Sequence, residues 1–324
     1  MKVVITGAAG FLGQRLAQRL LDLGHLSDNN GQDQKIDQLV LADVAPAPHS
    51  GDPRVRIATG DLSDVAFLRS IIDAETQSIF HLAAIVSGQA EAEFELGMRV
   101  NLDASLALLE ICRELEQKPK VVFTSSVAVY GGDLPQTVLD TTAVNPQSSY
   151  GTQKAICELL LNDYSRRGFV DGRTLRLPTI SIRPGKPNKA ASSFASGILR
   201  EPLNGETAIC PVSPQLRLWL SSPRQAIASL IAGHNLPAAA LGNNRSINLP
   251  GLSVTVQEML AALERQAGRE VAERVQFSPD PAIERIVASW PGALDDSRAK
   301  ALGLTGDADF DAVIQAYIQD DLAT

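Results

Sequence analysis

Residues 3–13 read VVITGAAGFLG, a β-branched run followed by three glycines that stand three positions apart. The run predicts a buried strand over 3–6, and apolar residues at helical spacing predict a helix over 11–23. A glycine-rich turn between a strand and a helix lets the backbone approach a phosphate group, which the helix N-terminus stabilises. We therefore interpret the turn as a nucleotide-binding site, with a plain tight turn as the alternative. The residues predicted to contact the nucleotide here are Gly7, Gly10, Phe11, Leu12 and Gly13.

The same alternation of strands and helices continues through the first half of the chain. Further elements are predicted as strands over 38–42, 55–58, 78–82, 120–124 and 174–176, helices over 64–72, 91–115 and 149–166, and a surface loop over 27–37. Such alternation is typical of a doubly wound parallel sheet with right-handed crossovers. The predicted fold class is therefore α/β.

The pattern changes after residue 176, where prolines divide the chain into loops and short elements. We expect residues 1–176 to form the nucleotide-binding domain. Residues 177–324 are expected to form mostly a smaller C-terminal substrate-binding lobe, with some segments returning to the sheet. Two helices are predicted in this lobe, over 254–267 and 309–318.

Composition argues against several classes of function. The 324 residues carry a formal net charge of −8, which disfavours a nucleic-acid partner. No apolar stretch approaches the length of a membrane span, so a membrane partner is not expected. The three cysteines are far apart and form no CxxC pair, which favours reduced thiols and a cytoplasmic location.

Metal and hydrolase chemistry are not indicated either. The four histidines, His25, His49, His81 and His234, are scattered without ligand spacing, so no metal site is expected. His81 ends a predicted strand and is interpreted as a packed core residue. The chain has no GxSxG motif, which argues against a serine hydrolase.

Asp43 points to the identity of the nucleotide. It ends the second predicted strand, where an acid hydrogen-bonds the adenosine ribose hydroxyls and repels a 2′-phosphate. The residues that follow, 44–46, supply no arginine for that phosphate, so NAD is favoured over NADP. A solvated aspartate at a strand end is the alternative.

Further predictions concern residues that follow the next two strands, and one polar residue, Asn101, within a predicted helix. Asp61 and Leu62 stand where an adenine pocket is expected, and Ala83 offers a small residue along which a dinucleotide can lie. Asn101 is polar within a predicted helix that otherwise looks buried. It either makes a local hydrogen bond or lies near the site, and the sequence leaves both open.

Ser126, Tyr150 and Lys154 form the candidate catalytic set. Tyr150 and Lys154 are four residues apart on a predicted helix and therefore share one face, while Ser126 leaves the preceding strand. A tyrosine that acts as a base near neutral pH needs its pKa lowered by about three units. We expect Lys154 and an oxidised nicotinamide to supply the positive charge, and Ser126 to orient the reacting oxygen. An ordinary exposed Tyr/Lys contact is the alternative.

Taken together, these motifs resemble the extended short-chain dehydrogenases/reductases, which include the NAD-dependent epimerase/dehydratase family. The resemblance covers essentially the whole chain and rests on the glycine turn, Asp43, Asp61-Leu62, Ser126 and the Tyr150/Lys154 pair. It implies a Rossmann sheet, NAD as cofactor, and Lys154 and Tyr150 also contacting that cofactor. It further implies a homodimer that pairs through the helices over 91–115 and 149–166.

Departures from the family patterns narrow the expected activity. The dehydratases place an Asp-Glu pair after the catalytic hydroxyl, whereas Val127 and Ala128 follow Ser126 here. The stretch 176–189 departs from the epimerase pattern and is similar to that of dehydrogenases of four-carbon sugar acids. The resemblance thus implies NAD-dependent oxidation of the 2-hydroxyl of a small sugar acid. Two alternatives remain: a nucleotide-sugar 4-epimerase with tightly bound NAD, and a non-catalytic NAD-binding regulator.

The candidate substrate residues follow from that chemistry. A small carboxylate suits one bidentate arginine, and Arg183 is the first choice. Thr179 and Ser192 are candidates for substrate hydroxyls, and Ser87 for the nicotinamide end; Ser126 and Tyr150 complete the substrate set. Arg183 is equally suited to grip a diphosphate, which is the epimerase alternative.

Overall fold

The computed structural model describes residues 1–48, 51–187 and 189–322. His49, one of the four histidines considered above, lies outside the described residues. No helix within these ranges has the length and apolar character that a membrane span requires.

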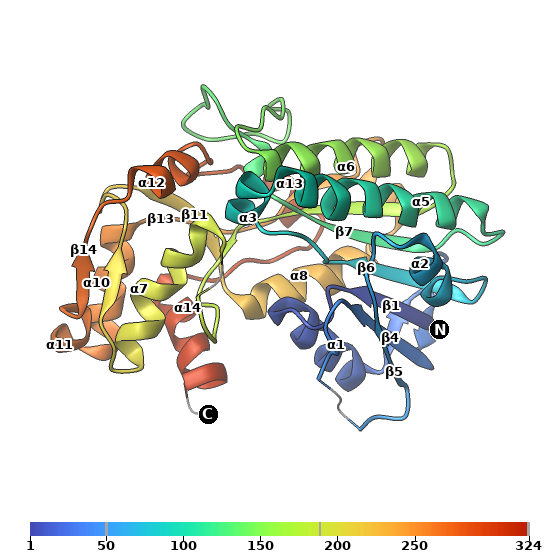
Figure 1. Cartoon of the computed structure of the whole chain (residues 1–324), viewed down its shortest axis with the longest axis horizontal. Coiled ribbons are helices and arrows are strands. Elements are labelled where there is room, and N and C mark those ends of the chain that lie inside the picture. Colours follow the sequence, from blue (N-terminus) through green and yellow to red (C-terminus); the bar gives the residue numbers. More distant parts are fainter. Residues whose placement is uncertain (49–50, 188, 323–324) are drawn as a thin grey trace.

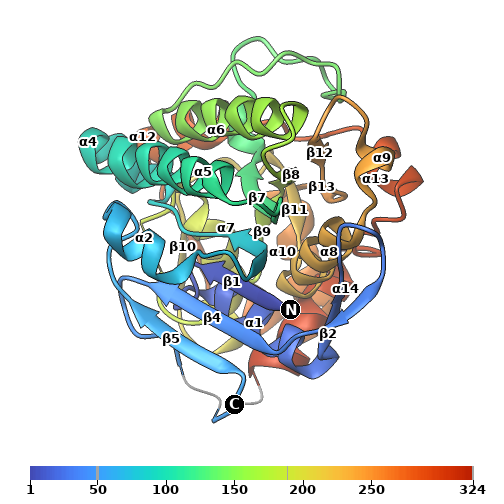
Figure 2. The ribbon, with the colours of Figure 1, turned by 90° about the vertical axis from the view of Figure 1, so that its right-hand side faces the viewer.

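A parallel sheet organises the larger part of the molecule (Figures 1 and 2). Within the described residues it has seven strands, in the order β12-β8-β7-β6-β1-β4-β5, and every neighbouring pair is parallel. From β1 the strands follow in chain order outward in both directions, with β4 and β5 on one side and β6, β7, β8 and β12 on the other. This is the arrangement of doubly wound folds, so the predicted α/β fold class is confirmed. The strands in chain order are β1 (Lys2–Thr6), β4 (Gln38–Asp43), β5 (Val55–Thr59), β6 (Thr76–His81), β7 (Lys120–Ser126), β8 (Asp171–Leu177) and β12 (Ser246–Asn248).

Helices cover both faces of this sheet (Figure 2). Successive side chains of a strand point to opposite faces, so Val3 and Ile5 of β1 pack with the helices on one side and Val4 with those on the other. The first side carries α1 (Phe11–Leu23) and α8 (Pro223–Asn235), and the second carries α2 (Val65–Ile71), α5 (Ala104–Glu114) and α6 (Ser149–Arg166). This double coverage buries the central strands completely, as a parallel sheet requires.

Two predicted elements differ in the structure. The polar stretch 27–37 is not a plain loop, because β2 (His25–Ser27) and β3 (Asp33–Lys35) pair as an antiparallel hairpin. The Asp28 carboxylate accepts hydrogen bonds from the backbone N–H groups of Asn30 and Gln32 and closes its turn. Polar side chains therefore stabilise a hairpin that hydrophobic periodicity does not reveal.

The predicted helix over 91–115 is broken into several pieces. These are α3 (Ser87–Ala92), α4 (Phe94–Gly97), a π-helical turn (Met98–Asp103) and α5. Asn101 lies within the π-helical turn, and its amide bonds the backbone N–H and C=O of Ile85. A π-bulge of this kind commonly marks a functional segment.

The smaller lobe packs around a second hydrophobic core beside the sheet (Figure 1). The predicted helices are present as α10 (Val256–Ala267) and α14 (Phe310–Tyr317). The chain re-enters the large sheet through α8 and β12, and the division at residue 176 remains a prediction. The other elements of this half are β9 (Thr179–Ile180), α7 (Phe194–Leu203), β10 (Ala208–Cys210), β11 (Arg217–Ser221), α9 (Ala238–Leu241), β13 (Leu252–Thr255), α11 (Arg269–Ala272), β14 (Val275–Phe277), α12 (Pro281–Ala288) and α13 (Ser297–Ala301).

Candidate active site

The glycine turn joins β1 to α1 at the carboxyl edge of the sheet. Gly7 has a φ of +73°, and a Cβ there would lie 2.7 Å from the backbone nitrogen of Ala83. A Cβ on Gly13 would collide with the carbonyl oxygen of Gly7. Gly10 caps α1 without a side-chain hydrogen bond, and the described first turn carries no acidic residue. The helix N-terminus is therefore open to an anionic group, which fits the pyrophosphate of a dinucleotide.

The predicted adenosine-side residues lie along the same edge of the sheet. Asp43 ends β4, and one carboxylate oxygen accepts a hydrogen bond from the backbone N–H of Ala9, 2.9 Å away. The Leu62 side chain is buried in the core of the sheet. The neighbouring Asp61 accepts a hydrogen bond from the backbone N–H of Ser63, which holds the pKa of the Asp61 carboxyl below the usual range. Asp43 has two partners of its own. Its other oxygen accepts a longer hydrogen bond, 3.4 Å, from the backbone N–H of Ala45, so Asp43 stabilises the glycine turn and the start of the following loop.

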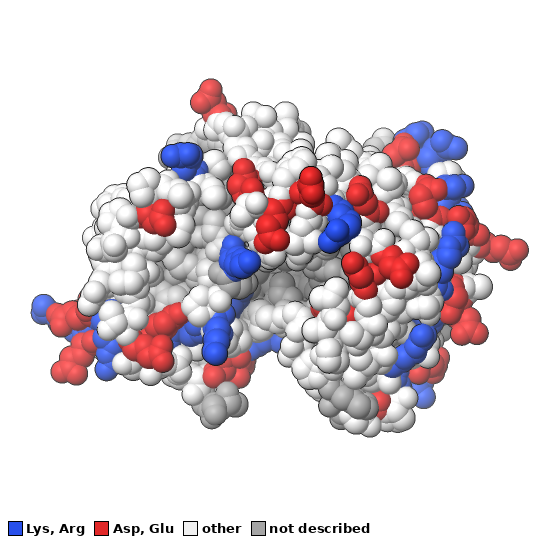
Figure 3. Space-filling model, in the orientation of Figure 1, with Lys and Arg blue, Asp and Glu red and all other residues white. Residues whose placement is uncertain are grey.

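A cavity of about 310 Å³ opens beside the glycine turn, between the sheet and the smaller lobe. Figure 3 shows the surface hollowed between the two parts of the molecule. Asp43, Asp61, Leu62 and Ala83 do not line this cavity. The predicted residues that do line it are Gly7, Gly10, Phe11, Leu12, Gly13, Ser87, Ser126, Tyr150, Lys154, Thr179, Arg183 and Ser192.

The candidate catalytic residues come from α6 and from the end of β7. The Ser148 hydroxyl accepts from the backbone N–H of Gly151 at 3.2 Å and begins α6 just before Tyr150. The Lys154 ammonium donates to the carbonyl of Thr124 at 2.8 Å and lies 5.8 Å from the centre of the Tyr150 ring. Ser126 and Tyr150 both line the cavity, and the Ser126 side chain acts to lower the pKa of Tyr150. The structure therefore brings the three predicted residues together.

In the protein alone the pKa of Tyr150 is raised, and the lowering expected with oxidised nicotinamide stays a prediction. Burial of the ring raises the pKa of Tyr150 to about 12, and the neighbouring Ser126 side chain and the charge of Arg183 only partly oppose this effect. Burial also lowers the pKa of Lys154 to about 8, because the cavity wall disfavours a charged ammonium. The positive charge of Arg183 favours the Tyr150 phenolate.

Arg183 offers an unneutralised guanidinium to the cavity. Its Nη2 donates to the Ser192 hydroxyl at 3.3 Å, and no described carboxylate lies within ion-pair distance of it. Its own backbone is held by Ser196, whose hydroxyl accepts from the Arg183 N–H at 3.0 Å, and by Arg200, which donates to the Arg183 carbonyl at 2.7 Å. A fixed guanidinium without a protein counter-ion is suited to a ligand carboxylate or phosphate.

Asn101 and Ser87 shape the walls of the cavity. Asn101 fixes the segment after β6, because its side chain bonds both backbone groups of Ile85 and donates to Gln153. The Ser87 hydroxyl accepts from the backbone N–H of Ala191 at 3.2 Å and joins the start of α3 to the substrate lobe. The side-chain partners of Asn101 lie 16 and 52 residues away along the chain, so these hydrogen bonds are not local, and the Ile85 segment that it fixes borders the cavity through Ala84 and Val86.

His81 is buried below the cavity floor, between the hydroxyls of Thr6 and Ser105. Burial lowers its pKa to about 3, so the imidazole stays neutral at physiological pH. Among the residues that the structure describes, no group of three His, Cys, Asp or Glu side chains has the spacing to hold a metal ion.

Sequence reasoning missed Trp290, which also lines the cavity. It follows α12 in the smaller lobe, and its indole N–H has no hydrogen-bond partner among the described residues. No local motif surrounds it, so only the folded chain brings it to the site.

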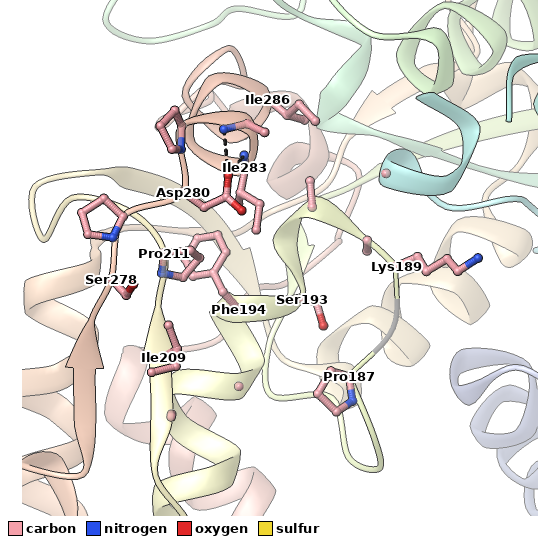
Figure 4. Close-up of a pocket in the computed structure, with 18 of the residues that line it drawn as sticks. Pro187, Lys189, Ser193, Phe194, Ile209, Pro211, Ser278, Asp280, Ile283 and Ile286 are labelled. Carbon is pink, nitrogen blue, oxygen red and sulfur yellow. Dashed lines mark hydrogen bonds between the residues drawn. The ribbon is translucent and has the colours of Figure 1, made fainter. Parts of the chain in front are cut away.

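A larger cavity of about 830 Å³ lies on the far side of the segment that carries Ser192. Figure 4 shows Phe194, Ile209, Ile283 and Ile286 around it, with Lys189 at one side. None of the predicted catalytic or cofactor residues lines it. The predicted catalytic residues therefore line the smaller cavity and not this one.

Comparison with known proteins places this geometry in a family. The NAD dependent epimerase/dehydratase family matches residues 3–223. D-erythronate dehydrogenase of Cupriavidus necator is 62% identical over 320 residues, covering 99% of this chain and 98% of that protein. D-erythronate dehydrogenase of Haemophilus influenzae is 53% identical over 323 residues, covering 99% and 100%.

A solved structure extends the likeness to three dimensions. The nucleoside-diphosphate-sugar epimerase from Agrobacterium tumefaciens superposes with a TM-score of 0.92 at 44% identity, over 100% of this chain and 95% of that one. NAD is the cofactor of the family, and the chain is an NAD-dependent oxidoreductase that acts on a small molecule. The glycine turn, the parallel sheet and these matches together show that the chain belongs to the NAD dependent epimerase/dehydratase family, within the extended short-chain dehydrogenases/reductases.

Proposed function

We propose that the protein oxidises the 2-hydroxyl of D-erythronate to 2-oxo-erythronate with NAD. The observation that carries this proposal is the near-full-length likeness, at 62% and 53% identity, to two D-erythronate dehydrogenases. The cavity supports it independently, because it holds one guanidinium without a protein counter-ion beside three hydroxyl-bearing residues of the substrate lobe and α3. A short hydroxy acid needs one carboxylate anchor and several hydroxyl contacts.

Tyr150 is the proposed general base. Its phenolate oxygen takes the proton of the substrate 2-hydroxyl, while the neighbouring Ser126 hydroxyl holds the reacting oxygen in line. Bound NAD supplies the acceptor for the hydride that leaves C2. Its positive charge and that of Arg183 oppose the burial that raises the pKa of Tyr150 to about 12. Lys154, fixed by Thr124, adds positive charge below the ring and is placed to hold the nicotinamide ribose.

The remaining roles complete the proposal. Arg183 binds the substrate carboxylate, Thr179 and Ser192 bind its hydroxyls, and Ser87 lines the nicotinamide end. On the cofactor side, the pyrophosphate is held by Gly7, Gly10, Phe11, Leu12 and Gly13. Asp43 binds the adenosine ribose, Asp61 and Leu62 border the adenine, and Ala83 is a small residue along which the dinucleotide lies. A cytoplasmic location stays a prediction.

A homodimer through α5 and α6 also belongs to the proposal. Leu106 on α5 and Leu159 on α6 are 37% and 67% exposed, and an apolar residue on each helix suits a helix-pair interface. Light scattering on the purified protein distinguishes a dimer from a monomer.

The nucleotide-sugar epimerase alternative has one observation in its favour, the likeness to the nucleoside-diphosphate-sugar epimerase from Agrobacterium tumefaciens. The two functions differ in the fate of the hydride. A dehydrogenase releases NADH in proportion to substrate, whereas an epimerase returns the hydride and accumulates none. Incubation with NAD and D-erythronate, with a UDP-sugar in parallel, separates them: NADH from the acid supports our proposal, and conversion of the UDP-sugar alone overturns it.

A further inference from the structure

β7 and α6 are joined by three successive contacts. At the end of β7, the Thr124 carbonyl accepts from Lys154, the Ser125 hydroxyl donates to Glu158, and Ser126 lies beside Tyr150 in the cavity wall. The three partners on α6 stand four residues apart and therefore lie along one face of the helix. Two of these contacts hold proposed catalytic residues. The third, at Glu158, has no assigned role.

Glu158 is a buried charge with a fixed counter-ion. Its side chain is 4% exposed, and Arg176 of β8 clamps it with Nε at 2.9 Å from Oε1 and Nη2 at 2.6 Å from Oε2. Arg176 also donates hydrogen bonds to the hydroxyl of Tyr130 and, at 3.3 Å, to the side-chain oxygen of Asn248 on β12. Glu158 therefore ties the helix that carries the catalytic pair to three strands of the sheet.

We propose that Glu158 is a positioning residue that holds α6 in register with the end of β7 and keeps the neighbouring Lys154 protonated. The inference rests on the proposed catalytic roles of Ser126, Tyr150 and Lys154. A buried carboxylate one helical turn from an ammonium favours its charged form, and a buried pair anchored on both sides allows little rotation of the helix.

The charges around Lys154 set the direction of the effect. Burial lowers the pKa of Lys154, and Cys157 and Glu158 both act in the opposite direction. The other titratable or charged groups near this site are Tyr150 and Cys157 of α6, His81 of β6, Arg176 of β8 and Arg183 of the substrate lobe. Of these, His81 is neutral near physiological pH and Cys157 is a buried thiol with a raised pKa, so Glu158 is the acid that favours the Lys154 cation.

The test is the pH profile of kcat for NADH formation from D-erythronate. Activity requires protonated Lys154, so kcat falls at high pH as Lys154 loses its proton, and this fall is the alkaline limb of the profile. Glu158→Gln removes the negative charge, and we expect the alkaline limb to move to lower pH by roughly half a unit or more. Glu158→Asp keeps the charge but shortens the reach, so it lowers kcat and leaves the limb in place. Glu273→Gln removes an acid from an exposed Glu–Arg pair of the smaller lobe and serves as the matched control.

An alkaline limb that stays in place in folded Glu158→Gln overturns the inference. If that variant does not fold, Ser125→Ala decides, because it keeps the charge pair and removes only the contact with β7. We expect its kcat to fall several-fold at unchanged KM for NAD, and an unaltered kcat overturns the inference. Wild-type protein that fails to turn over D-erythronate refutes the proposed function and this inference with it. If the wild-type protein turns over D-erythronate but the alkaline limb of Glu158→Gln does not move, this inference is refuted and the proposed function stands.

Discussion

Arg183→Met tests the proposed carboxylate site. The substitution keeps an unbranched side chain but removes the guanidinium that donates to the Ser192 hydroxyl. A hydrogen bond to a charged group is worth about 1.5–3 kcal/mol. At 1.36 kcal/mol for each factor of ten, kcat/KM for D-erythronate should fall about 10- to 150-fold.

The same variant should alter the pH dependence. The positive charge of Arg183 favours the Tyr150 phenolate, so its removal raises the pKa of Tyr150 and moves the acid limb of kcat to higher pH. Steady-state kinetics across pH, with NADH absorbance as the signal, measures both effects.

Lys186→Met is the matched control for this change. Lys186 is an exposed cation on the same segment, three residues from Arg183 and outside the set of residues that line the cavity. Its substitution should leave kcat/KM for D-erythronate within about twofold. An equal loss in both variants would show that the segment attracts anions generally and would refute a specific carboxylate anchor. Wild-type kcat/KM in Arg183→Met would refute the reasoning outright.

Three further predictions concern catalysis and the cofactor. Tyr150→Phe removes the proposed base and should lower kcat by at least about 100-fold with NAD binding intact; near-normal turnover contradicts the role. Asp43→Ala removes the group that repels a 2′-phosphate, so the preference of kcat/KM for NAD over NADP should shrink by about tenfold or more, and an unchanged ratio argues against ribose recognition. Gly13→Ala forces a Cβ onto the Gly7 carbonyl, which should cost roughly 1–3 kcal/mol of unfolding free energy and weaken NAD binding; calorimetry that finds wild-type values for both contradicts the close approach.

The fold was predictable because its signals are local. β-branched strands, the glycine turn and the Tyr150/Lys154 spacing each lie within a short stretch, and the family match at residues 3–223 bears out the fold they indicated. The hairpin of β2 and β3 was not predicted, because the Asp28 side chain, and not an apolar pattern, closes its turn. The π-helical turn at Asn101 was not predicted, because the apolar spacing continues through it. The hydrogen bonds of Asn101 go to Ile85, outside the pattern of the predicted helix.

The electrostatics and the far wall of the site depend on tertiary packing. Sequence spacing placed Lys154 near Tyr150, but it contains no measure of burial, and burial decides the direction of both pKa shifts. Trp290 reaches the cavity from the smaller lobe, far along the chain from Tyr150, so no spacing rule connects them. Glu158 was hidden for the same reason, since its partners lie on β7 and β8.

The most direct test of the central claim is NADH formation by purified wild-type protein supplied with NAD and D-erythronate. We predict stoichiometric NADH and a 2-oxo acid that a carbonyl reagent traps, with much weaker activity when NADP replaces NAD. An absence of NADH with D-erythronate and related four-carbon aldonates, together with conversion of a UDP-sugar, would contradict the account.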